Sequence, residues 1–278
     1  MKQRIISSAA GLAILAVVFA LFETIVLNIA VAIVIAMAAY ELLEAAGINN
    51  RPISTIALFF SLIIPFFGTR LLSNILASIC FLFSLALFCL LLKNHDTVRV
   101  EQLAFVFFFP MLIAFATTCF VYMRDVFGAT VGFYGVLVSL CGAWMSDTGA
   151  YFVGIAFGRH KLAPEISPKK TVEGLIGGIV VGLASQLLVA FVYAQICRYS
   201  GRPVQIDYLR LSLISPLISL ISVVGDLSAS VMKRQFGIKD FGNIMPGHGG
   251  VLDRFDSVLL VAPFVYNLFL YFSLIVLK

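Results

Sequence analysis

Hydrophobic residues in this chain come in long runs, separated by short segments that carry the charges. A helix needs about 20 apolar residues to cross the hydrocarbon core of a bilayer, and runs of that order recur from one end of the chain to the other. We therefore predict an all-α, polytopic membrane bundle of about nine transmembrane helices, without a soluble domain. The expected spans are residues 5–22, 24–43, 54–68, 71–92, 103–123, 128–157, 172–197, 209–232 and 257–277.

Composition supports a membrane protein. Hydrophobic residues make up 61% of the 278-residue chain and charged residues only 12%, with a mean hydropathy of +1.06. Soluble domains carry about twice that share of charge. The formal net charge is +5. With a cytoplasmic N-terminus, most Lys and Arg residues fall on the cytoplasmic side, as the positive-inside rule requires. The basic balance then reflects topology and does not indicate a nucleic-acid partner.

The chain divides by chemistry at about residue 125. Residues 1–125 form N-terminal transmembrane helices with few charges, mostly at the ends of apolar runs. Glu41 and Glu44 are expected where the second helix meets water. Residues 126–278, by contrast, carry ionisable groups within or against their apolar runs. We interpret this part as the catalytic transmembrane region.

Asp147 is the first of these ionisable groups. It lies within the long sixth run, and Lys, Arg and His are absent from Val126 to Gly158. A charged side chain at the membrane centre costs at least ~2.5 kcal/mol on insertion scales, so Asp147 should face a cavity or another helix. The alternative is a protonated or helix-paired residue that only aids packing.

A second polar stretch, Gly158 to Gly174, precedes the seventh run. Ser167 and Pro168 fit an N-cap followed by Pro at the first helical position, and Thr171 is an alternative cap. Lys169 and Lys170 would then lie beside a helix N-terminus, which favours phosphate. On charge alone, this segment also fits an ordinary basic loop at a membrane surface.

The third stretch, Gly225 to Ser257, is the richest in chemistry. Asp226, Ser230 and Lys233 are spaced to share one helical face. Asp253 and Asp256 are neighbours if they begin the last helix. The glycines around His248 bring backbone close to a ligand, because they lack a Cβ atom. Acids with Lys and Arg nearby suit Mg²⁺ bound to a nucleotide. Each residue taken singly also fits a charged interfacial loop, and their combination favours the site.

Ser228 to Asp256 resembles the signature of CDP-diacylglycerol synthases, also called phosphatidate cytidylyltransferases. The pattern is Ser, two residues, Lys-Arg, then Lys-Asp, Pro-x-His-Gly-Gly and Asp-Arg-x-Asp. The matching residues here are Ser230, Lys233, Arg234, Lys239, Asp240, Pro246, His248, Gly249, Gly250, Asp253, Arg254 and Asp256. The stretches SDTGAYFVG and ISPKKTVEG resemble the same family. The resemblance is strong from about residue 140 to 260, and the N-terminal half matches in hydropathy.

This resemblance implies a metal-dependent nucleotidyltransferase of phospholipid biosynthesis, in the inner membrane, with its active site facing the cytoplasm. Its substrates would be CTP and phosphatidate, and its products CDP-diacylglycerol and pyrophosphate. It implies metal ligands at Asp226, Asp253 and Asp256, for two Mg²⁺ ions, with a monovalent ion such as K⁺ and a homodimer as further options. Catalytic roles would fall to Asp226, Lys233, Arg234, Lys239, His248, Asp253, Arg254 and Asp256. Substrate-binding roles would fall to Asp147, Lys169, Lys170, Gly249 and Gly250.

The sequence departs from the family pattern at Ala229, where the family usually has an acid. If that acid helps to bind metal, this chain lacks one ligand or its support. Two other functions also fit parts of the pattern. An ion or solute transporter could use Asp147 and Asp226 as a coupling pair, and a CTP-dependent lipid kinase would release CDP instead of pyrophosphate. Neither the transporter nor an interfacial loop accounts for the GHGG turn and the cations together.

Overall fold

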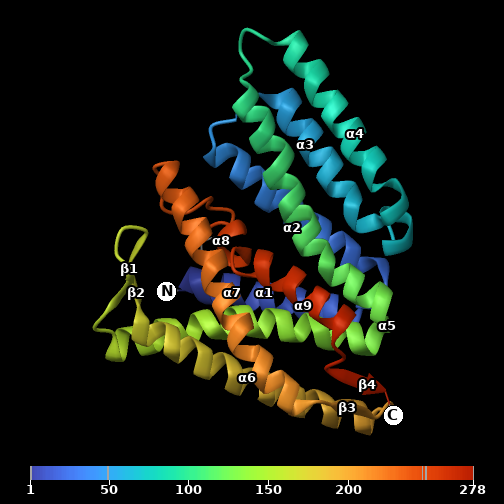
Figure 1. The fold of residues 1–278 in the computed structure, drawn as a ribbon, viewed down its shortest axis with the longest axis vertical. Helices are drawn as coiled ribbons and strands as arrows, with labels where there is room; N and C mark the ends of the chain where they lie inside the picture. The colour runs from blue at the N-terminus through green and yellow to red at the C-terminus, as the bar shows by residue number, and fades with distance from the viewer. Residues whose placement is uncertain (1, 49, 246, 248, 278) are drawn as a thin grey trace. The chain divides into compact units, whose positions relative to one another are not determined.

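A computed structural model of the chain describes residues 2–277 except 49, 246 and 248. Most of these residues lie in helices (Figure 1). The elements in chain order are α1 (Lys2–Ala20), α2 (Ile25–Ala45), α3 (Arg51–Ile63) with the 3₁₀ turn η1 (Ile64–Phe66), α4 (Thr69–Lys93), α5 (Val100–Phe157), β1 (Lys161–Ala163), β2 (Ser167–Thr171), α6 (Val172–Tyr199), β3 (Val204–Ile206), α7 (Tyr208–Gln235), α8 (Leu252–Phe255), α9 (Val258–Tyr271) and β4 (Ile275–Leu277).

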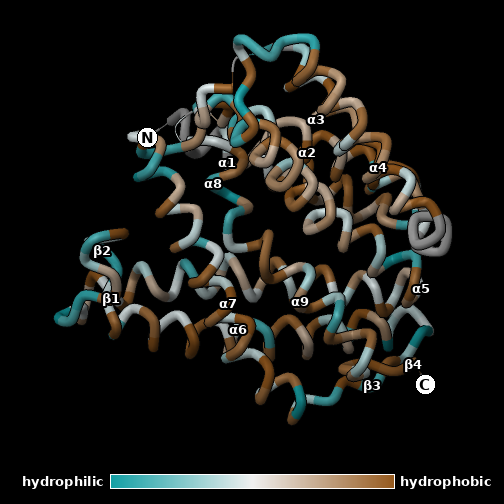
Figure 2. Tube along the Cα trace, turned by 45° about the horizontal axis from the view of Figure 1, so that its top comes forward, coloured by the Kyte–Doolittle hydropathy of each residue, from teal (hydrophilic) through white to brown (hydrophobic). Residues whose placement is uncertain are grey.

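Each apolar run expected from the sequence corresponds to a helical segment. Hydrophobic residues follow the helices, and the polar residues gather at the turns (Figure 2). Among the described residues, five helices are long and apolar enough to cross a membrane: Ile25–Ala45, Ile75–Lys93, Val100–Phe157, Val172–Tyr199 and Tyr208–Gln235. The structure is thus that of a helical membrane protein. The full number of spans stays a prediction.

Helix α5 contains two of the expected runs, 103–123 and 128–157. It is interrupted at Gly128, whose φ of 77° and ψ of 168° are not helical. Such a positive φ is easily adopted only by glycine. The two runs were therefore correctly separated, and the break lies at the first residue of the second run.

The described residues are mainly helical, as expected, with two short antiparallel ladders that were not expected, β1 with β2 and β3 with β4. One expectation was wrong in detail, because the last expected span, to residue 277, ends early. Phe272 adopts an extended backbone after α9, and Ile275–Leu277 then pairs with Val204–Ile206 instead of continuing the helix.

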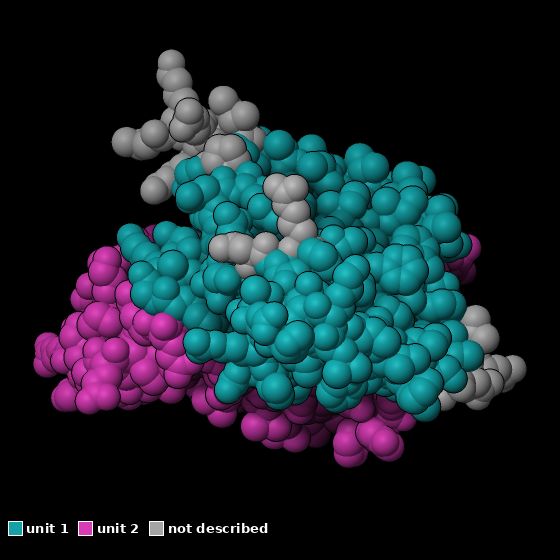
Figure 3. All heavy atoms as spheres, turned by 90° about the horizontal axis from the view of Figure 1, so that it is seen from above, with its two compact units in different colours: residues 1–125, 236–254 teal, residues 126–235, 255–278 magenta. Residues whose placement is uncertain are grey.

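The chain forms two compact units, coloured separately in Figure 3. Unit 1 contains residues 1–125 and 236–254, and unit 2 contains residues 126–235 and 255–278. The stretch 236–254, which holds most of the signature, thus belongs to the same unit as the N-terminal helices. The functional division between residues 1–125 and 126–278 stays a prediction.

Within unit 2, α7 packs against both α6 and α9. The second half of α5 meets α6 at glycines. A Cβ atom added at Gly174 would lie 2.7 Å from the carbonyl oxygen of Ala150, and one at Gly178 would lie 2.8 Å from that of Ser146. Small residues let helix backbones approach closely in a membrane bundle. The glycines of α6 therefore set the distance between these two helices.

Candidate active site

The hairpin formed by β1 and β2 places two lysines at the start of α6. Thr171 is the N-cap, and its hydroxyl accepts a hydrogen bond of 3.1 Å from the backbone N–H of Gly174. The cap expected at Ser167 and Pro168 was wrong, because these residues form β2, and Thr171, the alternative cap, is confirmed. Lys169 and Lys170 lie at the end of that strand, directly before the helix N-terminus.

The hairpin is fastened to α6 by Glu173. Its carboxylate accepts hydrogen bonds from the backbone N–H groups of Arg159, at 3.0 Å, and His160, at 3.2 Å, and also contacts the His160 ring. The backbone N–H of Val172 donates in turn to the carbonyl of His160, at 2.9 Å. These bonds hold the first strand of the hairpin against the helix start.

Lys170 forms an ion pair with Asp226 of α7, and both side chains are largely buried, with exposed fractions of 23% and 26%. The hydroxyl of Ser230, one helical turn further on, lies 3.4 Å from Asp226 Oδ1. The predicted shared face of Asp226 and Ser230 is therefore confirmed. Loss of either partner of such a partly buried pair destabilises the fold, because the other charge is left uncompensated.

Asp147 accepts hydrogen bonds from two serine hydroxyls. Ser257 donates to Oδ2 at 2.7 Å and Ser222 to Oδ1 at 3.3 Å. Both serines are buried. The expectation that Asp147 faces a cavity or another helix is confirmed, because these donors come from α7 and from the residue before α9, and Asp147 also lines a cavity.

Asp256 lies opposite Lys233, with Oδ2 3.9 Å from Nζ, and only 11% and 13% of the two side chains are exposed. The pKa of Asp256 is raised to about 7, mainly by burial and also by the negative charge of Asp226, against the opposing effect of Lys233. A buried carboxylate beside another one is stabilised by a nearby cation. Asp226 and Asp256 thus form a pair of interacting carboxylates within unit 2.

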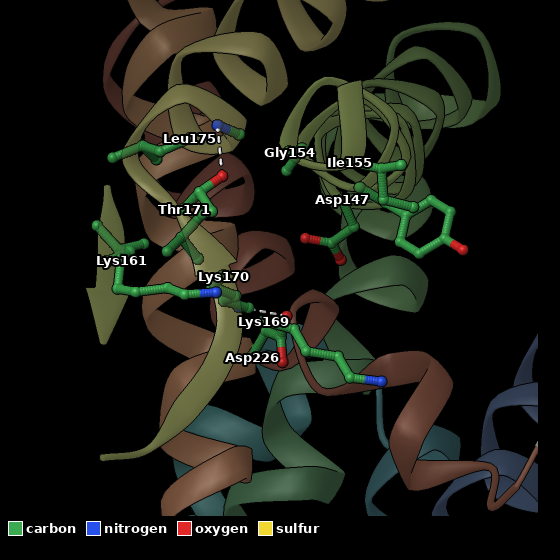
Figure 4. A pocket seen from close by; sticks show the side chains of 14 residues that line it. Asp147, Gly154, Ile155, Lys161, Lys169, Lys170, Thr171, Leu175 and Asp226 are labelled. Carbon is green, nitrogen blue, oxygen red and sulfur yellow. Dashed lines mark hydrogen bonds and ion pairs between the residues drawn. The ribbon is translucent and has the colours of Figure 1, made fainter. Parts of the chain in front are cut away.

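A cavity of about 570 Å³ opens beside these groups in unit 2. Asp147, Lys161, Lys169, Lys170 and Asp226 supply its charged wall. Tyr151, Ile155, Leu162, Leu175 and Val223 supply an apolar one. Figure 4 shows the Asp147 carboxylate, from α5, facing the hairpin across this space, with Asp226 below. The charged wall holds three lysines against two acids, and the opposite wall is hydrocarbon, so the cavity suits an amphipathic molecule that carries an anionic head.

The glycine-rich loop of the signature is held by Asp253 in unit 1. Asp253 Oδ2 accepts hydrogen bonds from the backbone N–H groups of Phe241, at 2.9 Å, and Gly250, at 3.1 Å. Gly249 has a φ of 84°, and its carbonyl accepts from Met245 N–H at 3.0 Å. Asp253 and Asp256 were expected to begin the last helix together. This was wrong, because α8 ends at Phe255 and α9 begins only at Val258. The two acids have different partners.

Glu41 is a residue that the sequence reasoning misplaced. It was expected in water, yet only 1% of it is exposed. Its Oε1 accepts from Val251 N–H at 3.0 Å and its Oε2 from Leu252 N–H at 2.9 Å. The helical periodicity of α2 could have indicated its burial, because the apolar residues Ile35 and Ala38 precede Glu41 at i+3 spacing on one face of the helix.

The other predicted site residues fall in different places. Lys239 and Arg254 are exposed in unit 1, and Arg234 is exposed at the end of α7 in unit 2. His248 lies outside the described residues. Unit 2 thus brings together Asp147, Lys169, Lys170, Asp226, Lys233 and Asp256, whereas Gly249, Gly250 and Asp253 are gathered in unit 1.

The donor chemistry of unit 2 fits a magnesium ion. Across the described part of the chain there is no group of three or more His, Cys, Asp and Glu side chains placed to bind a metal. Magnesium, however, is usually held by one or two carboxylates together with substrate phosphates and water. Asp226 and Asp256 offer two such carboxylates, now offset by Lys170 and Lys233. The metal ligands expected from the sequence stay a prediction.

Comparison with known proteins decides the family. The model of the cytidylyltransferase family matches residues 2–272. The chain belongs to this family. It is 36% identical to the phosphatidate cytidylyltransferase of Bacillus subtilis (strain 168) over 286 residues, which cover 98% of this chain and 99% of the relative.

Two staphylococcal relatives match about half of the chain. The phosphatidate cytidylyltransferase of Staphylococcus saprophyticus is 40% identical over 154 residues, 55% of each chain. That of Staphylococcus aureus (strain COL) is 42% identical over 136 residues, 48% of this chain and 47% of the relative.

Ala229, where the family usually has an acid, is buried in α7 with 3% of its surface exposed.

Proposed function

We propose that this chain is a phosphatidate cytidylyltransferase, which converts CTP and phosphatidate into CDP-diacylglycerol and pyrophosphate. The similarity over almost the whole length to a cytidylyltransferase of that name carries the proposal. The amphipathic cavity of unit 2 supports it, because phosphatidate joins a phosphate monoester to two acyl chains. The family match favours this reaction over the transporter and over the lipid kinase.

In this reaction a phosphate oxygen of phosphatidate attacks the α-phosphorus of CTP. The new O–P bond replaces the bond to pyrophosphate, which leaves with its electron pair. A phosphate monoester has a second pKa near 6, so most of it is dianionic at neutral pH and needs no strong base. No covalent enzyme intermediate is required. Catalysis then depends on positioning the two anions and offsetting their charge.

The residues of unit 2 can do both. Lys161, Lys169 and Lys170 on the hairpin would bind the phosphate of the lipid, while the apolar wall accommodates the start of its acyl chains. Asp226 and Asp256 would hold Mg²⁺, which supplies positive charge to the reacting phosphates. The serines beside Asp147 fix its carboxylate, so that it keeps one orientation in the cavity.

The rest of the predicted ligand set comes from the sequence signature alone. Asp253 as a third metal ligand, a second metal ion, a monovalent ion and a homodimer remain proposals on that basis. So do Lys233, Arg234, Lys239, His248 and Arg254 as phosphate-binding or catalytic groups, and Gly249 and Gly250 as substrate contacts.

We also propose that the protein lies in the inner membrane with nine spans. Its N-terminus and its active site would face the cytoplasm. The excess of Lys and Arg on one side of the expected topology supports this orientation. Labelling of single cysteines from outside intact cells tests it. Cysteines introduced in the hairpin should be protected, and cysteines introduced near Arg202 should react. Labelling of the hairpin would contradict the orientation.

Pyrophosphate release by the purified protein tests the function. Mixed micelles of detergent and phosphatidate would receive CTP and Mg²⁺, with ATP in place of CTP, omission of lipid and excess EDTA as controls. We expect release that requires CTP, lipid and the metal together. CDP-diacylglycerol should form in equal amount. Formation of CDP instead would indicate a lipid kinase. Absence of release, together with solute uptake that does not depend on CTP when the protein is placed in liposomes, would indicate a transporter.

A further inference from the structure

Glu41 is a buried carboxylate to which the reaction above assigns no role. It lies at the C-terminal end of α2, and both of its oxygens accept backbone N–H groups that lie 210 and 211 residues further along the chain. Burial of a carboxylate is unfavourable unless hydrogen bonds compensate it. Bonds to a charged acceptor are about twice as strong as neutral ones. The helix therefore holds the start of α8 by two strong bonds.

The glycines of the loop complete this contact. A Cβ atom added at Gly250 would lie 2.5 Å from Glu41 Oε2, and one added at Gly242 would lie 2.5 Å from Oε1. Real Cβ atoms do not approach other atoms so closely. The Glu41 carboxylate thus occupies the space that a Cβ atom would need at both glycines. On that side of Gly250 the neighbour is thus the protein itself, and the substrate contact expected at Gly250 stays a prediction.

Such a contact gives a defined shape to a segment that is flexible by composition. Glycine loses more conformational freedom on ordering than any other residue. A loop that is already ordered binds its ligand without that entropic cost. Both oxygens of Glu41 are engaged by N–H groups, so its effect on a nearby anion comes through the shape of the loop.

We propose that Glu41 is a positioning residue for the nucleotide: it docks Gly242 and the residues from Gly249 to Leu252 in the conformation that binds the phosphates of CTP. The inference rests on the proposed function, which supplies the nucleotide. It involves only residues of unit 1. The signature loop and the second helix would then act as one part of the site, although they are far apart in sequence.

Steady-state kinetics of the purified protein in phosphatidate micelles test this role. Glu41→Gln keeps the side-chain volume but places an amide NH₂ where a backbone N–H donates, so one bond is lost. Gly250→Ala places a methyl group against the carboxylate. We expect each variant to raise the KM for CTP about tenfold, the effect of losing one charge-assisted hydrogen bond. The KM for phosphatidate should stay within about twofold of wild type.

Matched controls are available within unit 1. Glu44→Gln changes an exposed acid one turn further along α2. Gly68→Ala adds a methyl group where nothing lies within 4 Å. Both should leave the two KM values unchanged. Glu41→Asp, which retains the charge but shortens the side chain, should give an intermediate KM for CTP, and it serves in place of Glu41→Gln if that variant does not fold.

Hydrogen exchange provides a readout that does not need activity. In Glu41→Gln the amides of Val251 and Leu252 should exchange about tenfold faster, while amides of α6 and α7 keep their rates. A loss of kcat with unchanged KM values and uniformly faster exchange would make Glu41 a general stability residue and overturn the inference. Wild-type exchange and wild-type kinetics in both variants would do so as well. Wild-type protein without CTP-dependent release of pyrophosphate would instead contradict the proposed function.

Discussion

Buried and half-buried carboxylates are used in opposite ways in the two units. In unit 2, Asp226 and Asp256 face the ammonium groups of Lys170 and Lys233, beside a cavity. In unit 1, Glu41 and Asp253 accept backbone N–H groups and hold the chain in shape. An ammonium partner can be exchanged for a metal ion or a substrate, whereas a backbone partner is fixed by the fold. Acids of the first kind are suited to chemistry and those of the second kind to positioning, to which Asp253 would add the metal role that the signature implies.

The largest effect is expected from Asp226→Asn. It removes the charge that pairs with Lys170 and that would bind the proposed metal ion, but keeps the volume of the side chain. We expect turnover to fall at least about a hundredfold, because metal-ion stabilisation of a phosphoryl transfer contributes several kcal/mol. Pyrophosphate release measures this loss. Exchange of the loop amides in unit 1 should not change. Near-normal turnover in this variant would remove Asp226 from the reacting centre.

The variant Asp253→Asn removes the charge needed for metal binding but keeps an oxygen that can accept the backbone hydrogen bonds, so it tests the two roles of this residue separately. Both backbone bonds end on Oδ2, and the amide oxygen of Asn can accept them. If Asp253 acts only through the loop, activity should fall less than about threefold. We expect a larger fall, about thirtyfold, with little change in the exchange rates of Phe241 and Gly250, because the signature implies a charge requirement. A small fall would assign Asp253 to positioning alone, together with Glu41.

Lys170→Met should act on the lipid substrate. The variant removes the cation from the cavity wall and retains most of the hydrocarbon chain. We expect the KM for phosphatidate to rise about tenfold, since one charge-assisted contact with the phosphate is lost. The KM for CTP should change less. Lys93→Met, at the exposed end of α4, is the control. Equal changes in both KM values would argue against a separate lipid-phosphate site at the hairpin.

The smallest effect is expected from Ser257→Ala. Its hydroxyl donates to Asp147 at 2.7 Å, and the serine is buried with 1% of its surface exposed. Loss of this bond should cost about 1 kcal/mol, which lowers the midpoint of thermal unfolding by a few degrees. Differential scanning calorimetry in detergent measures the shift. Ser212→Ala, which removes an exposed hydroxyl bonded within α7, is the control. An unchanged midpoint would mean that Ser222 alone is sufficient to hold Asp147.

The helices were predictable from the sequence because the lipid environment requires long apolar runs, and each run became a helix. The break in α5 at Gly128 was predictable as well, because it lies at the boundary between two such runs. The hairpin was not predicted, because Ser167 and Pro168 also fit a helix start. Only the pairing with β1, of Lys161 with Thr171 and of Ala163 with Ser167, distinguishes the two. Local patterns describe an element but not its partner in space.

The same limit explains the outcome at the site. Asp226 and Ser230 were placed on one face, since both lie on one helix. The role of Glu41 was missed, because its partners are distant in sequence and are backbone groups, which leave no mark in the pattern of side chains. Only the glycines at 242 and 250 carry a trace of it, and glycines in a loop are usually explained by turns.

The glycines of α6 have a consequence for the timing of catalysis. They bring the backbone of α6 against that of α5 at Ala150 and Ser146, so these helices meet without intervening flexible side chains. Asp147 and the lysine hairpin are therefore fixed relative to each other before a lipid arrives. The arrangement of these charges is completed when the protein folds, and little reorganisation energy remains to be supplied in each turnover. The mobile partner in the encounter would then be the lipid, which must tilt its phosphate out of the bilayer to reach them.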